Sequence, residues 1–154
     1  MKAATKAAAV AEEGQEAALQ DLLADLVVLS LHSKQAHWNV TGPQFSPLHE
    51  LFDRMADEHR AWYDLVAERL RALDAPADGR VFVLAGSSVE EMPAGPLPGE
   101  RAAALLHERV EGTAFRARAA LGPLGEADPV TQDMVIGIVE GLEKQAWILR
   151  VQAR

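Results

Sequence analysis

The chain has 154 residues, and 49% of them are hydrophobic, so it is long and apolar enough to form one domain with a sizeable core. Its formal net charge of −8 argues against nucleic-acid binding driven by charge, and the absence of cysteine excludes disulfides and thiolate metal sites. No apolar run is long enough to cross a membrane, and the Ala-rich N-terminus is too short and too weakly apolar for a signal peptide. We therefore expect a cytoplasmic protein with no membrane partner.

The first half of the chain predicts a short tail followed by two helices. Residues 1–13 (MKAATKAAAVAEE) are predicted to be a mobile tail. Leucines at helical spacing predict a first helix from about residue 14 to about residue 40, which Gly42-Pro43 ends. Ser46 is the predicted N-cap of a second helix with Pro47 in its first position, and this helix runs to about Leu73.

The second half predicts a long connection and two more helices. Residues 74–99 are rich in proline and glycine and form a crossover with a short helix near residues 88–92. A third helix covers residues 100–121 and is closed by Gly122-Pro123, and Asp128-Pro129 caps a fourth helix that reaches the C-terminus. Four helices with one long central crossover predict an all-α, ferritin-like four-helix bundle over residues 14–154.

Two pairs of metal-ligating residue types lie on one face of the second helix. His49 and Asp53 are i, i+4 neighbours, and so are Asp64 and Glu68. Asp64 follows Asp53 by eleven positions, which leaves the two pairs only about 20° apart around the helix axis. The pairs are centred about 22 Å apart along that axis, whereas metal–ligand bonds are about 2 Å long. One helix therefore cannot bring both pairs to one metal ion.

A two-fold axis would bring the two pairs together. If a second copy of the helix crosses the first antiparallel near residues 58 and 59, the 49/53 pair of one chain faces the 64/68 pair of the other. His37, at the end of the first helix, would complete each site. Two imidazoles and three carboxylates suit Fe(II), Mn(II) or Zn(II). The alternative is that these charges are simply a solvated helix face. No Glu is followed three residues later by His, so the site is not of the Glu-x-x-His type built inside one bundle.

The stretch KQAHWNVTGPQFSPLHELFDRMADEHRAWYDLVAERLRAL, residues 34–73, resembles the Dps family of mini-ferritins. The family pattern of His-Trp-Asn, Gly-x-x-Phe, His-x-x-x-Asp and Asp-x-x-x-Glu-Arg is matched in order, and weaker similarity covers most of the chain. The resemblance assigns the five ferroxidase ligands of the family to these positions: His37, His49, Asp53, Asp64 and Glu68.

The resemblance also implies an activity and an assembly. It implies a hollow dodecamer that binds Fe(II) between two-fold-related subunits and oxidises it, with hydrogen peroxide preferred over oxygen. Ferric mineral is then stored in the cavity, which protects the cell from oxidative damage. In the family, both histidines and the first aspartate come from one subunit, and the second aspartate and the glutamate come from its partner.

The termini depart from the DNA-binding members of the family, which carry tails rich in lysine and arginine. The first sixteen residues contain only Lys2 and Lys6 as cations against three glutamates, and only Arg150 and Arg154 lie near the C-terminus. A dodecamer would carry a formal charge of about −96, twelve times −8. We therefore expect weak or absent DNA binding, while association with the nucleoid in the bacterial cytoplasm stays open.

Three further groups of residues carry weaker functional hypotheses. Aromatic side chains near the predicted ligands are candidates to trap stray oxidising equivalents, with ordinary packing as the alternative: Trp38, Trp62 and Tyr63. Acidic residues at the start of the fourth helix resemble those that line an iron-entry pore in the family: Glu126, Asp128 and above all Asp133. The remaining histidines are predicted to lie at the surface or in an interface: His32, His59 near the two-fold axis, and His107.

Three functions compete at this stage. The first is a ferroxidase and iron-storage protein. The second is a structural protein that coats nucleoid DNA, against which the acidic termini argue. The third is an oligomer that binds Zn(II) or Mn(II) without redox chemistry, since these ions accept the same ligands as iron.

Overall fold

A computed structural model describes the backbone of residues 2–154 and the side chains of residues 13–154. Its elements in chain order are α1 (Lys2–Asn39), β1 (Val40–Thr41), α2 (Phe45–Ala72), α3 (Val81–Leu84), β2 (Leu97–Pro98), α4 (Gly99–Ala127) and α5 (Pro129–Gln152). The helix α1 thus begins N-terminal to the expected start, and the mobile tail over residues 1–13 remains a prediction. Within the described part of the chain, no helix has the length and apolar character needed to cross a membrane.

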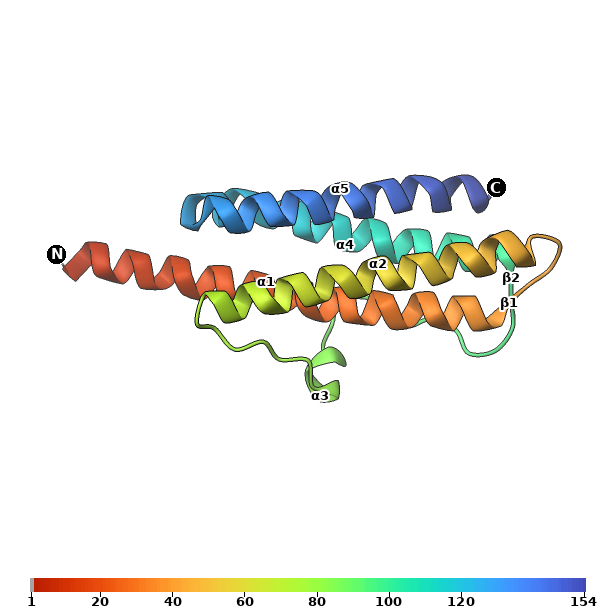
Figure 1. The fold of residues 1–154 in the computed structure, drawn as a ribbon, viewed down its shortest axis with the longest axis horizontal. Coiled ribbons are helices and arrows are strands. Elements are labelled where there is room, and N and C mark those ends of the chain that lie inside the picture. The colour runs from red at the N-terminus through yellow and green to blue at the C-terminus, as the bar shows by residue number, and fades with distance from the viewer. Residues whose placement is uncertain (1) are drawn as a thin grey trace.

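The four long helices confirm the all-α bundle and its central crossover (Figure 1). The helix α2 lies along α1, and α5 lies along α4, so that each pair is a helical hairpin. The crossover runs over the outer side of α1 and returns to the far end of the bundle, where β2 pairs in parallel with β1. In this register Val40 is opposite Leu97, which ties the end of α1 to the start of α4.

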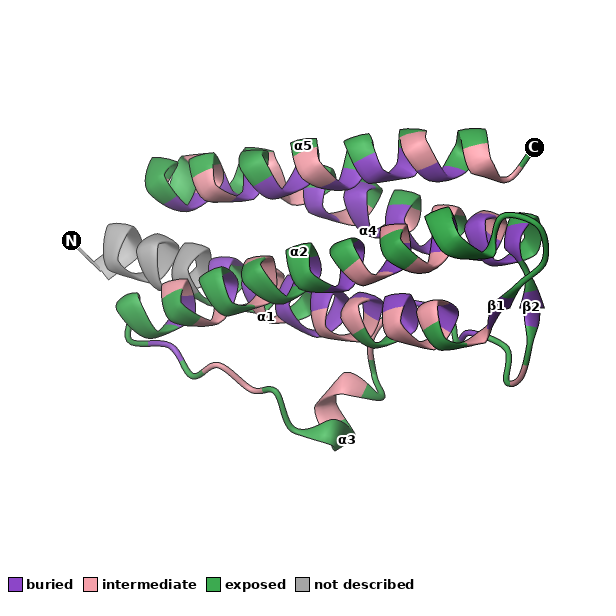
Figure 2. Ribbon diagram, turned by 45° about the vertical axis from the view of Figure 1, so that its right-hand side comes forward, coloured by how far each residue is buried: buried purple, intermediate pink, exposed green. Residues whose placement is uncertain are grey.

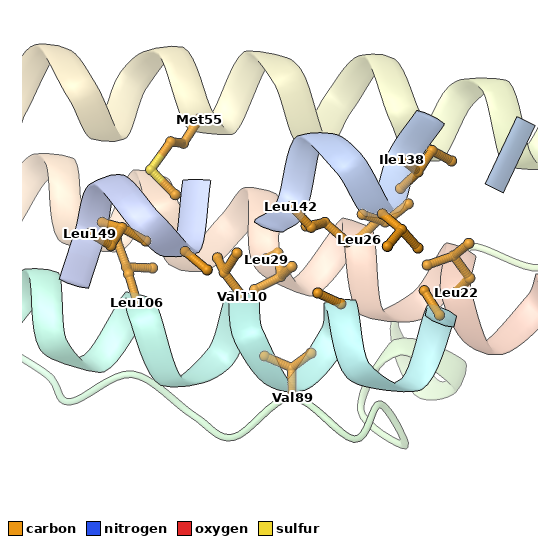
Figure 3. Packing of buried hydrophobic residues seen from close by; sticks show 14 of the residues in the cluster. Leu22, Leu26, Leu29, Met55, Val89, Leu106, Val110, Ile138, Leu142 and Leu149 are labelled. Atoms are coloured by element: carbon orange, nitrogen blue, oxygen red, sulfur yellow. The ribbon is translucent and has the colours of Figure 1, made fainter. Parts of the chain in front are cut away.

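The core is a continuous layer of aliphatic side chains between the two hairpins. Leu26 and Leu29 of α1, Met55 of α2, Leu106 of α4 and Leu142 of α5 are each at most 5% exposed (Figure 3). Figure 2 shows that the buried side of every long helix faces this layer, while the outer side of α2 is exposed along most of its length. Burial of one stripe per helix is the pattern that holds an amphipathic bundle together.

The short crossover helix lies at residues 81–84, so its prediction near residues 88–92 was wrong. The backbone there is held in another shape by buried charges from the long helices. Asp25 accepts hydrogen bonds from the Ser87 hydroxyl at 2.7 Å and from the Ser88 amide at 3.2 Å. Arg109 donates to the carbonyl oxygens of residues 90 and 91, at 2.8 and 2.5 Å. A helix over these residues would need the same backbone groups for itself.

Two helix ends also differ from the predictions. The helix α2 begins at Phe45 with Gln44 in the N-cap position and no side-chain cap, so Ser46 is not its N-cap. The helix α4 continues through Pro123 to Ala127 rather than ending at residue 121. Proline removes one backbone donor, and the carbonyl that loses its partner belongs to Ala119, which is exposed. The predicted cap of the fourth helix is confirmed, because the Asp128 side chain accepts a hydrogen bond from the Val130 amide at 3.0 Å.

The prediction of surface or interface positions was wrong for two of the three remaining histidines. His59 is fully buried and His32 is 7% exposed, whereas His107 is partly exposed and its surface or interface position stays a prediction. His59 lies about 120° around α2 from Asp53, which turns it into the bundle rather than toward a two-fold axis. Its Nε2 donates to the Gln145 side-chain oxygen at 2.8 Å, and its Nδ1 is 3.4 Å from the Ser33 hydroxyl.

Burial of His59 predicts a specific loss of stability in acid. Desolvation lowers the pKa of His59 from 6.5 to about 4, against the weaker effect of its hydrogen bond to Gln145. Below pH 6.5 His59 is protonated in the unfolded chain, whereas in the folded chain it stays neutral until about pH 4. The stabilisation is therefore complete above pH 6.5 and is lost as the pH falls toward 4, by about 2 kcal/mol between about pH 7 and about pH 5.

Urea unfolding followed by circular dichroism at these two pH values measures this loss. A His59→Gln variant keeps a side chain that hydrogen-bonds but does not titrate, so its free energy of unfolding should fall by about 2 kcal/mol less than that of the wild type. An equal fall in both proteins would show that His59 does not carry the effect.

Candidate metal centre

The turn between α1 and α2 places two imidazole rings face to face. The rings of His37 and His49 are stacked with centroids 3.7 Å apart and planes 19° from parallel. Nδ1 of His37 is 2.7 Å from the carbonyl oxygen of His49, and Nδ1 of His49 is 2.8 Å from the carbonyl oxygen of His37. Because a carbonyl oxygen only accepts, each Nδ1 carries the proton and donates it. Both Nε2 atoms therefore keep a free lone pair in the neutral rings, the form in which imidazole binds a metal ion.

The local sequence explains why the two rings meet. Gly42 has φ of +103°, a conformation that favours glycine, and its carbonyl oxygen accepts a hydrogen bond from the Phe45 amide at 3.0 Å. The chain thus reverses within a few residues, and the Phe45 ring stacks on His49 with centroids 4.9 Å apart. Among residues 13–154, neither Nε2 of the histidine pair has a hydrogen-bond partner. Neither of these two atoms is buried. Both reach the surface of the subunit.

Asp53 lies one turn after His49, and its carboxylate is partly occupied. Nζ of Lys34 is 2.5 Å from one of its oxygens, Oδ1. The hydrogen bond from Lys34 lowers the pKa of Asp53, opposed by a small desolvation effect and aided by the charges of Lys34, His37 and His49. The carboxylate is therefore ionised, and Oδ2 remains for a metal ion. The ammonium of Lys34 also lies 5.9 Å from the centre of the Trp38 ring.

Asp64 and Glu68 lie at the other end of α2. Both are exposed, and neither makes an ion pair or a side-chain hydrogen bond within the described part of the chain. Over the same residues, no three His, Asp or Glu side chains converge closely enough to hold a metal ion. One subunit thus brings the rings of His37 and His49 together, with Asp53 one turn further along α2, and leaves Asp64 and Glu68 about 22 Å away along the helix. The five residues remain a predicted metal centre that needs a second chain.

The aromatic residues near the predicted ligands have different surroundings. Trp38 is 67% exposed in the single chain. Trp62 is partly buried against α5, where a Cβ added to Gly141 would lie 2.3 Å from its ring, and its centroid is 5.6 Å from that of His59. Glycine at position 141 therefore makes room for the indole. The trapping role of these rings, including Tyr63, remains a prediction.

Asp128 is committed to contacts inside the subunit. Hydrogen bonds from the Thr131 hydroxyl and from Arg69 hold the pKa of its carboxyl well below the usual range, with the Val130 amide as a further donor. Arg69 also donates to Thr131 at 2.9 Å, so it joins the end of α2 to the start of α5. Glu126 and Asp133 are exposed, and their pore role remains a prediction.

Sequence reasoning missed the roles of Lys34 and Arg69. Arg69 follows the last predicted ligand directly and was interpreted only as part of a motif. Lys34 precedes His37 by three residues, which places both on one side of α1. That spacing is the signal that could have indicated a cation beside the metal centre.

A test of Lys34 follows from its contact with Asp53. A metal dication must approach the carboxylate that the ammonium of Lys34 neutralises, so Lys34→Met should tighten the binding of Zn(II), a redox-inert probe, by roughly threefold to tenfold. Isothermal titration calorimetry measures the change. Lys144→Met removes an exposed lysine from α5 and should leave the affinity unchanged. Equal affinities for wild type and Lys34→Met would show that Lys34 does not compete with the metal ion.

The comparisons with known proteins find relatives of the chain in both sequence and fold. A family described as "Ferritin-like domain" matches residues 16–154. The DNA protection during starvation protein of Agrobacterium fabrum is 34% identical over 88% of this chain and 85% of its own length. The fine tangled pili major subunit of Haemophilus ducreyi is 36% identical over 86% of this chain and 71% of its own length. The structure of Dps from Microbacterium arborescens in the high iron form is 30% identical and has a TM-score of 0.86, covering 90% of this chain and 91% of that one.

Sequence, fold and structural neighbours thus lead to one family. The family match spans nearly the whole of the bundle, and the relative from Agrobacterium is aligned over most of both chains. The chain belongs to the Dps family of ferritin-like proteins.

Proposed function

We propose that this protein is a Dps-type mini-ferritin that oxidises Fe(II) at sites shared by two-fold-related subunits. The observation that carries the proposal is the stacked pair of His37 and His49. Their reciprocal hydrogen bonds fix both protons on Nδ1 and leave the two Nε2 lone pairs free on stacked rings. Asp53 stands one turn away as an ionised oxygen ligand. Such a cluster of nitrogen and oxygen donors, open to solvent, suits Fe(II) as a substrate.

The residues of the two chains divide the work. The imidazoles bind iron as neutral donors, so protons compete with the metal ion for the two Nε2 atoms. Asp53, with Asp64 and Glu68 of the partner subunit, supplies negative charge that favours the ferric product over the ferrous substrate. The reaction takes two Fe(II), one hydrogen peroxide and two protons to two Fe(III) and two water molecules. Each Fe(II) loses one electron, and the O–O bond of the peroxide is cleaved.

The same proposal includes the assembly and its location. We infer a dodecamer whose hollow centre stores the ferric product, in the cytoplasm of a bacterium, with Asp133 among the candidates for an iron-entry route. Support comes from the family, and from the related Dps of Microbacterium arborescens, whose structure is of a high iron form. Joint removal of Fe(II) and peroxide would deprive the cell of the reagents that damage DNA.

Two alternatives use the same chain differently. A non-redox oligomer would hold Zn(II) or Mn(II) with the same five ligands. A DNA-coating protein would need exposed cations, but several of the basic side chains are already paired: Arg80 with Asp78, Arg118 with Glu143 and Arg116 with Asp25. We therefore favour the ferroxidase.

The central test is anaerobic loading with Fe(II) followed by peroxide. The wild type should oxidise iron rapidly and keep the ferric product in solution, as followed by its absorbance. Asp64→Ala/Glu68→Ala removes two exposed ligands that make no ion pair or side-chain hydrogen bond within residues 13–154, so the variant should fold normally and lose at least about 90% of the initial rate.

The control for this test carries equal changes elsewhere. Glu100→Ala/Glu111→Ala removes two exposed carboxylates from α4 and should retain the wild-type rate. If the wild type oxidises iron no faster than buffer and a ferric precipitate forms, the non-redox interpretation is preferred.

A second prediction concerns DNA. Because the assembly is strongly acidic, we expect no gel shift of double-stranded DNA at about 150 mM salt, and at most weak retention through Lys2 and Lys6 at low salt. A variant lacking residues 2–6 should then behave like the wild type at the higher salt concentration. Tight binding at about 150 mM salt would contradict the charge argument.

A further inference from the structure

The exposed face of α2 carries two opposite charges that the proposed ferroxidase site does not use. Asp57 and Arg60 are both exposed, and neither makes an ion pair or side-chain hydrogen bond within residues 13–154. With Ala61, Tyr63 and Asp64 they line a surface hollow of about 410 Å³. Figure 2 shows that this side of α2 is uncovered in the single chain. The charges are thus available to another molecule.

The register that builds the metal centre also determines what these two charges meet. His49 and Glu68 lie at equal distances from the midpoint between residues 58 and 59, and so do Asp53 and Asp64. A two-fold axis through that midpoint therefore sets His49 opposite the partner's Glu68, and Asp53 opposite the partner's Asp64. Asp57 and Arg60 are centred on the same midpoint, so Asp57 is set opposite the partner's Arg60.

The helical geometry places this pair in the contact rather than beside it. Relative to Asp53, Asp57 lies about 40° to one side around α2 and Arg60 about 20° to the other. Both are inside the arc that the predicted ligands occupy. The two-fold operation then creates two opposite-charge contacts near the axis, one on each side of it, between the two predicted metal centres.

We propose that reciprocal ion pairs between Asp57 and the partner's Arg60 hold two copies of α2 in the register that completes both metal centres. The proposal rests on the proposed function, because it takes the location of the axis from the predicted ligands. A slip of one helical turn would move the partner's Glu68 by about 5.4 Å from His49, far more than a bond of about 2 Å to a shared metal ion tolerates. The register must therefore be specified by something other than iron itself.

Charge and size on this face both support a second copy as the occupant. Five carboxylates line the face, at positions 50, 53, 57, 64 and 68, and without cations two copies would repel each other. Arg60 supplies the opposite charge where the repulsion would be strongest, at the crossing point. Ala61, beside Arg60 in the sequence and exposed, is small enough to let the two helices approach closely.

The test uses charge reversal on each side of the pair. Arg60→Glu should raise the protein concentration at which the metal-free assembly dissociates by at least about tenfold, and Asp57→Arg should do the same. Sedimentation velocity over a dilution series measures the effect, and circular dichroism confirms that each variant is folded. When the two variants are co-expressed with different affinity tags, mixed assemblies should form with wild-type stability. In a mixed pair, Asp57 of the chain with Arg60→Glu faces the unchanged Arg60 of the other chain. The two substituted positions also face each other with opposite charges, so both ion pairs are restored.

Two comparisons make the test decisive. Arg54→Glu makes the same charge change on α2 but about 100° around the helix from Asp53, and it should leave the dissociation concentration unchanged. Wild-type assembly of Arg60→Glu, or failure of the co-expressed variants to recover it, would overturn the proposal. Asp57→Arg/Arg60→Glu in one chain should also assemble normally. If only this double variant recovers, the ion pair lies within one chain and the proposal is wrong. Assembly is measured without metal, so it is independent of iron oxidation. If the co-expressed variants recover assembly but the wild type does not oxidise iron, the ion pairs are supported and only the proposed ferroxidase activity is rejected.

Discussion

The straightness of α2 is the constraint on which the proposed chemistry depends. A continuous helix from Phe45 to Ala72 holds His49 and Asp53 about 22 Å from Asp64 and Glu68, and no movement of side chains can close that distance. The subunit therefore carries a half-site at each end of one helix. In the proposed dimer, one antiparallel contact between equal helices would supply every missing ligand and so complete two sites. The cost is that function depends on the register between chains, which gives the unused charges at positions 57 and 60 a purpose.

Within one half-site, the ligands are oriented by the backbone of their neighbours. Each imidazole of the His37–His49 pair donates to the carbonyl oxygen of the other residue, so the two rings fix each other's proton and direction without a carboxylate partner. Lys34 acts in the opposite sense, since it holds the carboxylate of Asp53 in its ionised form and also neutralises it. We infer that the metal-free subunit is stabilised by the lysine and that iron must displace or share it. Such a contact keeps an acidic site stable while it is empty.

Most of the bundle and the grouping of the site residues could be predicted from the sequence, because both depend on local periodicity. Leucines at helical spacing indicate α1, and the spacing of His49, Asp53, Asp64 and Glu68 indicates a shared face regardless of the rest of the fold. The position of the crossover helix could not be predicted, because Asp25 and Arg109, far away in the chain, bind the backbone of residues 88–91, where the helix was expected. The prediction for His59 was wrong for a related reason. Its polar character favours the surface, whereas Gln145, 86 residues later, provides a partner in the core.

That buried contact has a consequence for the exposed face. His59 reaches Gln145 of α5 from the side of α2 that faces the bundle, and Trp62 rests on Gly141 of the same helix. Arg69 adds an ion pair with Asp128 at the end of α2. These contacts oppose rotation of α2 about its own axis, and a rotation by one residue, about 100°, would bring the ligand face toward the core. The buried imidazole of His59 thus helps to fix the rotation of α2. That rotation determines where the charged side chains on the opposite face of the helix point. A core made only of leucines would pack as densely but would specify the rotation of α2 less strictly, because apolar contacts are not directional.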